Sequence, residues 1–260
     1  MNILVTFALE NEFAPWRAMH NFRSGKCGGA DAQFAEIGGA GVSVVLTGVG
    51  PKQAALGASL ALRIEHESIN FCVSSGLAGG LRPAYQVGQV LAARRIFSEN
   101  LRDDGESRVI ESSAALTSFA AEGGATVADQ FFSANHPVGT AVEKQLLSAK
   151  SDAVEMESFE ILHRARDCGV PAVAIRAISD TLNEDLPLDM HEILTEEGQV
   201  SIPRVLGQVA RHPQSLPGLL RLGQNSKRAA EALAQFLDQY VARIAEKAKP
   251  LDAKVLMAGN

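Results

Sequence analysis

Short apolar runs alternate with segments of helical periodicity up to residue 178. The run at 2–7 is apolar almost throughout, which is typical of a strand covered on both faces, and a helix is predicted from Glu10 onward. The same pattern predicts further strands at 42–47, 70–75, 87–92, 125–132, 152–154 and 172–178, and helices at 52–64, 138–148 and 156–168. This alternation predicts a single-domain, three-layer α/β/α fold with a central mixed, mainly parallel sheet.

The pattern changes in two places. Residues 98–121 are charged and Ser/Ala-rich with poor periodicity, so we expect a loop with a weak helix that forms a mobile surface excursion. A C-terminal helical segment is expected from about residue 189, with a long amphipathic helix at 225–247 whose apolar face is more typical of packing on the sheet than of binding a partner. The domain is expected to span 1–247, and 248–260 to form a disordered tail.

Composition narrows the class of protein. A length of 260 residues with 46% hydrophobic content is enough for one core of the larger α/β kind. The net charge of −6, with scattered Lys and Arg, argues against a nucleic-acid partner and favours a small molecule. Neither the three cysteines nor the six histidines have metal-ligand spacing, and no disulfide framework is apparent, so we expect no metal and reduced thiols.

The same sequence gives an expectation for where the protein acts. The N-terminus lacks a basic leader, and no apolar run approaches the roughly 20 residues of a membrane span. We therefore expect a cytoplasmic protein with no membrane span.

Acidic residues follow three of the predicted strands. In parallel sheets, ligands bind outside the carboxyl ends of the strands, which is where Glu12, Glu157 and Asp180 are expected. Each has a purely structural alternative. Glu12 and Glu157 suit the first turn of a helix, and Asp180, like Ser179, is a good N-cap residue.

Five short segments, taken in order, carry a family resemblance. They are 8–12, 47–50, 75–81, 154–158 and 176–180, with the sequences ALENE, TGVG, SGLAGGL, VEMES and RAISD. Together they resemble the nucleoside phosphorylase superfamily, most closely its methylthioadenosine/S-adenosylhomocysteine nucleosidase branch. The resemblance covers about 1–182. The chain beyond Leu186 is more similar to hopanoid-associated phosphorylase-like relatives.

The resemblance implies a nucleoside phosphorylase-like fold and an activity. The expected reaction is hydrolysis of the N-glycosidic bond of an adenosine-like, 5′-modified nucleoside, without cofactor or metal, by a homo-oligomer. Breaking this bond leaves negative charge on the departing base, so an acid must reach the purine N7. Asp180 is expected to be that acid, since partial desolvation at a strand end favours the protonated form. Glu12 is expected to activate the attacking water, with Glu10 as its solvated neighbour.

The remaining site residues are also assigned from the resemblance. Glu157 is expected to bind both ribose hydroxyls above Met156, and Arg176 to order the acids, although a plain buried ion pair would look the same. The segment 129–132 is similar to the family's purine-binding segment, so Phe131 and Phe132 are expected to stack on the base, unless they are core residues. Gly79 and Ser179 are expected to contact the substrate as well.

One position departs from the family pattern. Leu77 stands where the family often has a hydroxyl residue in the glycine loop. We expect Ser74 or Ser75 to take over the contact to the nucleophile or the ribose.

Several alternatives stay open at this point. A phosphorylase on the same scaffold is one, although Glu10 and Glu12 would repel a phosphate dianion. An enzyme that acts on futalosine or adenosylhopane would keep nearly all of these residues. A nucleoside-binding regulatory protein without activity is the alternative from another class.

Overall fold

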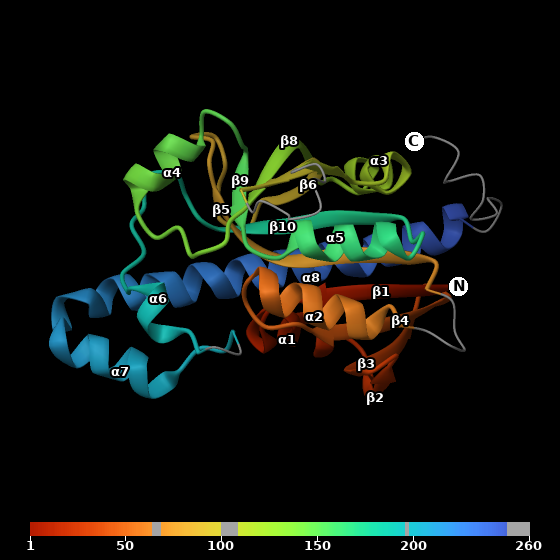
Figure 1. Ribbon diagram of the computed structural model, residues 1–260, viewed down its shortest axis with the longest axis horizontal. Coiled ribbons are helices and arrows are strands. Elements are labelled where there is room, and N and C mark those ends of the chain that lie inside the picture. Colours follow the sequence, from red (N-terminus) through yellow and green to blue (C-terminus); the bar gives the residue numbers. More distant parts are fainter. Residues whose placement is uncertain (64–68, 100–108, 196–197, 249–260) are drawn as a thin grey trace.

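The computed structural model describes residues 1–63, 69–99, 109–195 and 198–248 (Figure 1). Ten strands of the described chain form one sheet in the order β10-β6-β8-β9-β5-β1-β4-β3-β2, with β7 added at β6. Their bounds are β1 Asn2–Phe7, β2 Arg23–Cys27, β3 Ala30–Ile37, β4 Ala40–Leu46, β5 Phe71–Gly80, β6 Val90–Ser98, β7 Val109–Glu111, β8 Thr126–Ser133, β9 Ala153–Glu155 and β10 Ala172–Asp180.

One part of the sheet closes on itself, and the other part extends from it as an open sheet. Strand β10 pairs with β5 as well as with β6, so β10, β6, β8, β9 and β5 form a closed circuit, and β1, β4, β3 and β2 extend from it. Strand β1 pairs in parallel with β4 and β5, and β5 with β10. Strands β6 and β10, β5 and β9, and the β2–β3–β4 meander pair antiparallel. The sheet is therefore mixed, as predicted, with more antiparallel pairing than we expected.

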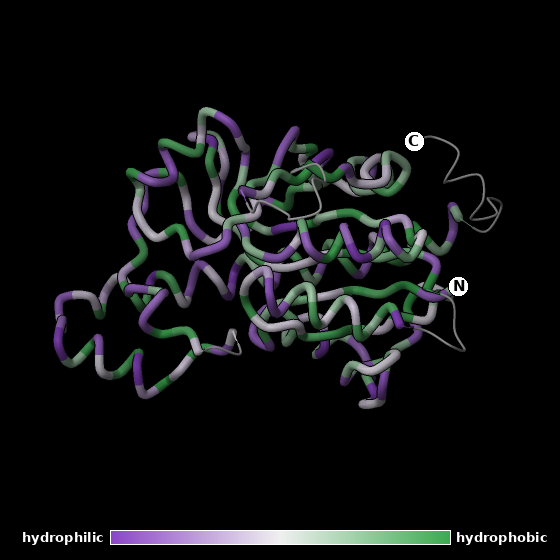
Figure 2. The backbone as a smooth tube through the Cα atoms, in the orientation of Figure 1, coloured by the Kyte–Doolittle hydropathy of each residue, from purple (hydrophilic) through white to green (hydrophobic). Residues whose placement is uncertain are grey.

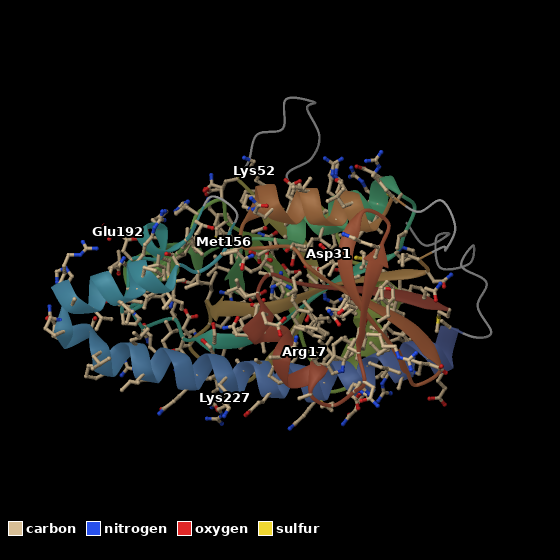
Figure 3. All side chains as sticks on the ribbon, turned by 90° about the horizontal axis from the view of Figure 1, so that it is seen from below. Arg17, Asp31, Lys52, Met156, Glu192 and Lys227 are labelled. Atoms are coloured by element: carbon tan, nitrogen blue, oxygen red, sulfur yellow. The ribbon has the colours of Figure 1, made fainter. Side chains whose placement is uncertain are left out.

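Helices cover both faces of the sheet and complete the predicted three layers. Their bounds are α1 Glu10–Arg17, α2 Pro51–Ala61, α3 Ala114–Glu122, α4 Ala141–Leu147, α5 Ser158–Asp167, α6 Met190–Ile193, α7 Ile202–Arg211 and α8 Leu216–Ala248. Helices α1, α3 and α8 pack with one core cluster and α2 and α5 with the other. Figure 3 shows α8 along one side of the molecule and α2 along the opposite side.

The central strands are apolar on both faces because each face meets a helical layer. In β1, Val5 belongs to the cluster under α8, whereas Leu4 belongs to the cluster under α2. In β10, Ile175 belongs to the cluster under α8 and Ala174 belongs to the cluster under α2. Figure 2 shows the hydrophobic colour gathered along these strands.

The C-terminal helix confirms the predicted amphipathic packing but is longer than predicted. It begins at Leu216 and not at 225, and buries Leu233, Leu237 and Ile244 against the sheet. Helices α6 and α7 and the start of α8 project from one end of the body (Figure 1). The expected tail lies, apart from Ala248, outside the described residues. Over the described ranges, no helix is long and apolar enough to cross a membrane.

The fold corrects one sequence prediction and contains one hairpin that was not predicted. The expected surface excursion at 98–121 is wrong where the structure describes it, because β7 pairs with β6 and α3 buries Leu116 and Ala120, while 100–108 lie outside the described residues. The hairpin of β2 and β3 was not predicted, because the edge strand β2 is largely polar and exposed and the apolar positions of β3 are interrupted by polar residues.

Candidate active site

The glycine-containing end of β5 lies between the predicted acids. The Glu12 carboxylate lies beside Gly76, and the Asp180 carboxylate lies beside Gly79. In each case the nearest carboxylate oxygen is 3.1 Å from the position that a Cβ atom on the glycine would occupy. Because these glycines have no side chain, the two carboxylates approach the strand from different elements. Strand β5 therefore brings together residues that are far apart in the sequence.

Glu12 lies at the start of α1 with 7% of its surface exposed. Its Oε2 accepts hydrogen bonds from the N–H of Ala8 and of Leu9, both at 3.0 Å, and its Oε1 accepts one from Leu77, also at 3.0 Å. Burial raises the pKa of Glu12 above its usual value, against the lowering effect of these backbone donors. The carboxylate offers about four acceptor positions, so one remains for a further donor.

Glu10 is placed differently, on the outside of the same helix. It is exposed and its Oε1 forms a surface ion pair with Arg17 at 2.7 Å. The structure does not bring it to the other acids, because its exposed carboxylate pairs with Arg17 on the surface of α1.

Arg176 and Glu155 form a buried ion pair beneath the site. Arg176 is 1% exposed, and its guanidinium donates to Glu155 Oε2 at 2.6 Å and to the Ser74 carbonyl at 2.8 Å. The same Glu155 oxygen accepts from the N–H of Glu157 at 3.0 Å and of Ser158 at 2.7 Å. The pair therefore fixes the turn that carries Glu157, a role for Glu155 that we did not predict.

Glu157 joins this turn to the glycine loop after β4. Its Oε1 accepts from the N–H of Gly50 at 2.9 Å, and its Oε2 lies 3.6 Å from Arg176. Burial, together with the charges of Glu155 and Glu12, raises the pKa of Glu157 to about 7, although Arg176 opposes the shift. Met156, half-buried and labelled in Figure 3, has its methyl group 3.7 Å from where a Cβ on Gly50 would stand.

Asp180 ends β10 and is held through both carboxylate oxygens. Ser179 Oγ donates to Oδ1 at 2.7 Å, and the ammonium of the buried Lys144, on α4, forms an ion pair with Oδ2. Lys144 comes from a distant part of the chain, and its contact with Asp180 was not part of the sequence prediction.

The two predicted aromatic residues lie on opposite faces of β8. Phe131 is fully buried in the core cluster under α2 and α5, so the structure does not bring it to the acids. Phe132 packs in a smaller cluster with Val154, Leu182 and Met156, and its ring stacks on Phe97 at 5.9 Å between centroids. Of the two, Phe132 is the one beside the predicted site residues.

The hydroxyl residues of β5 are both buried. Ser74 Oγ lies 3.0 Å from Ser158 Oγ and accepts from Arg176, so it belongs to the support of the acids. Ser75 Oγ has no hydrogen-bond partner among the described residues. At Leu77 it is the backbone N–H, and not the side chain, that contacts the site.

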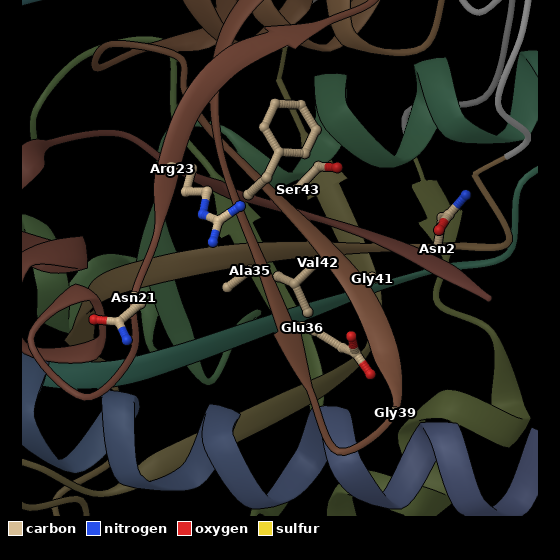
Figure 4. A pocket seen from close by; sticks show the side chains of 10 residues that line it. Asn2, Asn21, Arg23, Ala35, Glu36, Gly39, Gly41, Val42 and Ser43 are labelled. Atoms are coloured by element: carbon tan, nitrogen blue, oxygen red, sulfur yellow. The ribbon is translucent and has the colours of Figure 1, made fainter.

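A cavity of about 470 Å³ lies elsewhere, over β3 and β4 near the start of β1 (Figure 4). Arg23, Glu36 and Asn2 are among its lining residues, and none of the predicted acids is. Across the described parts of the chain, no group of three or more His, Cys, Asp or Glu side chains is placed to hold a metal ion.

The chain matches a known protein family and is similar in fold to several solved structures. The model of the phosphorylase superfamily matches residues 2–207. The native futalosine hydrolase of Helicobacter pylori is 18% identical, with a TM-score of 0.70 and coverage of 95% of this chain and 98% of that chain. The Campylobacter jejuni 5′-methylthioadenosine/S-adenosylhomocysteine nucleosidase is 16% identical, with a TM-score of 0.71 and coverage of 94% and 99%.

A third solved structure is that of the Neisseria meningitidis 5′-methylthioadenosine/S-adenosylhomocysteine nucleosidase in complex with methylthio-immucillin-A. It is 21% identical, with a TM-score of 0.69 and coverage of 93% of this chain and 98% of that chain. At these identities the three likenesses establish the fold.

Proposed function

Because the chain belongs to the phosphorylase superfamily, whose model matches residues 2–207, we propose that it hydrolyses the N-glycosidic bond of an adenosine-like, 5′-modified nucleoside and releases the purine base. The observation that carries this proposal is the Glu12 carboxylate. It is buried, held by three backbone donors and raised in pKa, with one acceptor position left over. These are the properties of a general base for a single water molecule.

In this proposal Glu12 and Asp180 have different roles in the reaction. As the bond between the ribose and the base breaks, positive charge develops on the sugar, and Glu12 takes a proton from the water that attacks the anomeric carbon. Asp180 donates a proton to N7, so that the base leaves as a neutral molecule. Ser179 fixes the orientation of the Asp180 carboxyl group.

Glu157 and its neighbours bind the substrate in this proposal. The Glu157 carboxylate accepts hydrogen bonds from both ribose hydroxyls, and Met156 packs beneath the sugar ring. Phe132 stacks on the base, supported by its position in one cluster with Met156 and its contact with Phe97. Arg176 supports the site from below, through Glu155.

Water is favoured over phosphate as the nucleophile. Phosphate needs cationic or backbone donors, but both terminal nitrogens of the Arg176 guanidinium already donate, Nη1 to the Ser74 carbonyl and Nη2 to Glu155. The backbone N–H groups of Ala8, Leu9 and Leu77 are committed to Glu12. A phosphate dianion beside Glu12 and Glu157 would also meet like charges at a site of low dielectric constant.

The test is a chromatographic assay of products after incubation with methylthioadenosine, S-adenosylhomocysteine, futalosine and adenosine, with and without phosphate. We expect base and free reducing sugar to appear at equal rates without phosphate. A strict requirement for phosphate with a sugar 1-phosphate as product would make the protein a phosphorylase. Binding of these nucleosides without release of base would instead favour the nucleoside-binding regulatory protein.

A further inference from the structure

Lys144 is a lysine with no exposed surface, and its ammonium has three acceptors. It forms an ion pair with Asp180 and donates to the carbonyl oxygens of Glu184 at 2.8 Å and Thr181 at 3.1 Å. An ammonium has three N–H donors, so all of them are used. Asp180 is the acid proposed to serve the departing base, and Lys144 is the residue that contacts it from the protein side.

The position of Lys144 is set by the helix that carries it. Helix α4 begins with a capping box in which Thr140 Oγ1 accepts from the N–H of Glu143 at 3.2 Å and Glu143 accepts from the Thr140 N–H at 3.0 Å. Asp185 Oδ1 accepts from the N–H of Ala141 at 2.7 Å, which ties this helix end to the segment after β10. Lys144 and Asp180 are therefore held together before any ligand binds.

The other carboxylates near Lys144 have partners of their own. Glu184 turns its carboxylate onto Thr181, whose N–H and Oγ1 donate at 2.9 and 3.0 Å, and Arg221 of α8 interacts electrostatically with Glu184. Glu143 and Asp185 are held at the start of α4. Asp180 is the carboxylate in direct contact with the ammonium.

This arrangement raises the question of where the proton for the base comes from. Oδ1 of Asp180 accepts from the Ser179 hydroxyl and Oδ2 faces the Lys144 ammonium, so both oxygens meet donors of the protein. A proton that reaches N7 through this carboxyl group has to be supplied to it, and Lys144 is the ammonium in direct contact with it.

We propose, on the basis of the function proposed above, that Lys144 is a positioning residue that supplies the proton which Asp180 passes to the purine N7. As the bond from the anomeric carbon to the base nitrogen breaks, its electron pair passes to the base. The Asp180 carboxylate takes a proton from the Lys144 ammonium, the electron pair of the broken N–H bond stays on the lysine nitrogen, and the Asp180 carboxyl group passes a proton on to N7. Asp180 ends as a carboxylate, Lys144 as a neutral amine, and the base leaves neutral; Lys144 regains a proton from solvent after the products leave.

The test compares K144M and K144R with the parent and with K150M, which changes an exposed lysine just after α4. The measurement is kcat/KM against pH from 5 to 10. In the parent we expect an alkaline limb at or above pH 8, because the proton stays with the ion pair until the ammonium is lost. In K144M, Asp180 must carry the proton alone, so the limb moves at least two pH units lower and the rate at pH 8 falls at least 100-fold.

K144R separates proton supply from charge. An arginine keeps the positive charge but does not release a proton, so K144R should be as slow as K144M. Recovery of the rate in K144R, or a K144M profile lowered equally at every pH, would reduce the pair to a structural ion pair and overturn the proposal. A parent limb below pH 8 would overturn it without any variant, which covers the case in which K144M does not fold.

A second substrate distinguishes this inference from the proposed function. The leaving group of p-nitrophenyl riboside needs no proton, so K144M should cleave it within about threefold of the parent rate while failing on the nucleoside. Equal losses on both substrates would overturn the role in proton supply. If the parent releases no base from any nucleoside, it is the proposed function that fails.

Discussion

A Cβ atom on Gly76 would lie 3.1 Å from Oε1 of Glu12 and 3.4 Å from Oε2. Gly76 has a φ of +150°, a backbone conformation that residues with a side chain rarely adopt. The next residue along β5, Leu77, donates its N–H to the same carboxylate. The absence of a side chain at 76 is therefore what lets Glu12 reach β5.

Replacing Gly76 with alanine should disturb Glu12 more than the rest of the fold. We expect G76A to lower kcat/KM at least tenfold and to lower the melting temperature, because the carboxylate must move and the backbone is strained. G207A is the matched control, since Gly207 lies in α7 with open space around its Cβ position. Parental activity in G76A would show that the close contact does not matter to the site.

Glu12→Gln removes the proposed base while keeping the size of the side chain. An amide still offers one oxygen to the backbone donors but does not take a proton from water at neutral pH, so hydrolysis should fall by about 100-fold or more. Circular dichroism and thermal melting serve to check that the variant folds. E10Q changes the exposed neighbour and should stay near the parental rate. An unimpaired E12Q variant would require a different base.

Asp180→Asn keeps the size of the side chain and removes the acid. We expect turnover to fall roughly 100-fold or more while nucleoside binding survives, which calorimetry and steady-state kinetics measure separately. The neutral amide also leaves the buried Lys144 ammonium without its counter-charge, so some loss of stability is expected. Near-normal turnover would remove Asp180 from the mechanism.

The raised pKa of Glu157 predicts how stability depends on pH. In the folded protein this pKa is about 7, against 4.5 for the ordinary carboxyl group. Between these two values the folded state keeps a proton that the unfolded state has lost, so the parent loses stability as pH rises from about 5 to 7, by up to ~3 kcal/mol for this group. The side chain of the Glu157→Gln variant does not titrate, so this variant should lose less stability than the parent over the same pH range.

Urea unfolding at pH 5 and pH 8 measures this difference. E10Q is the control, because an exposed carboxyl should leave the pH dependence as in the parent. Equal pH-dependent losses in E157Q and the parent would contradict the assignment. The same pKa predicts that kcat/KM rises as pH passes through about 7, if the ionised carboxylate is the form that accepts the ribose hydroxyls.

The strands and layers were predictable because their signal is local. A continuous apolar run such as 2–7 needs cover on two faces, and the structure provides it through α8 and α2. The β2–β3 hairpin carries no such signal, because the edge strand β2 faces solvent and polar residues interrupt the apolar positions of β3. In the segment 98–121 the weak helix was predicted and is present as α3, whereas β7 was missed because it is only three residues long.

The site was only partly predictable, for a related reason. The order of Glu12, Glu157 and Asp180 follows from strand ends, which sequence patterns can place. Lys144 looks like any surface lysine of an amphipathic helix, and only the docking of α4 against the segment after β10 buries it. Nor does the sequence say which of two adjacent phenylalanines faces the core, because a shift of one residue exchanges the faces of a strand.

The packing of α8 makes the first helix of the chain depend on one of the last. Helix α1, which carries Glu12, buries Phe13 and Trp16 in the same cluster as α8, and His20 just after it pairs with Asp238 at 2.5 Å. During synthesis, β1 and α1 therefore leave the ribosome more than 200 residues before the surface that covers them. Helix α1 carries Glu12, the proposed general base, so the helix on which that residue lies has its full packing only once the α8 residues have been made and folded.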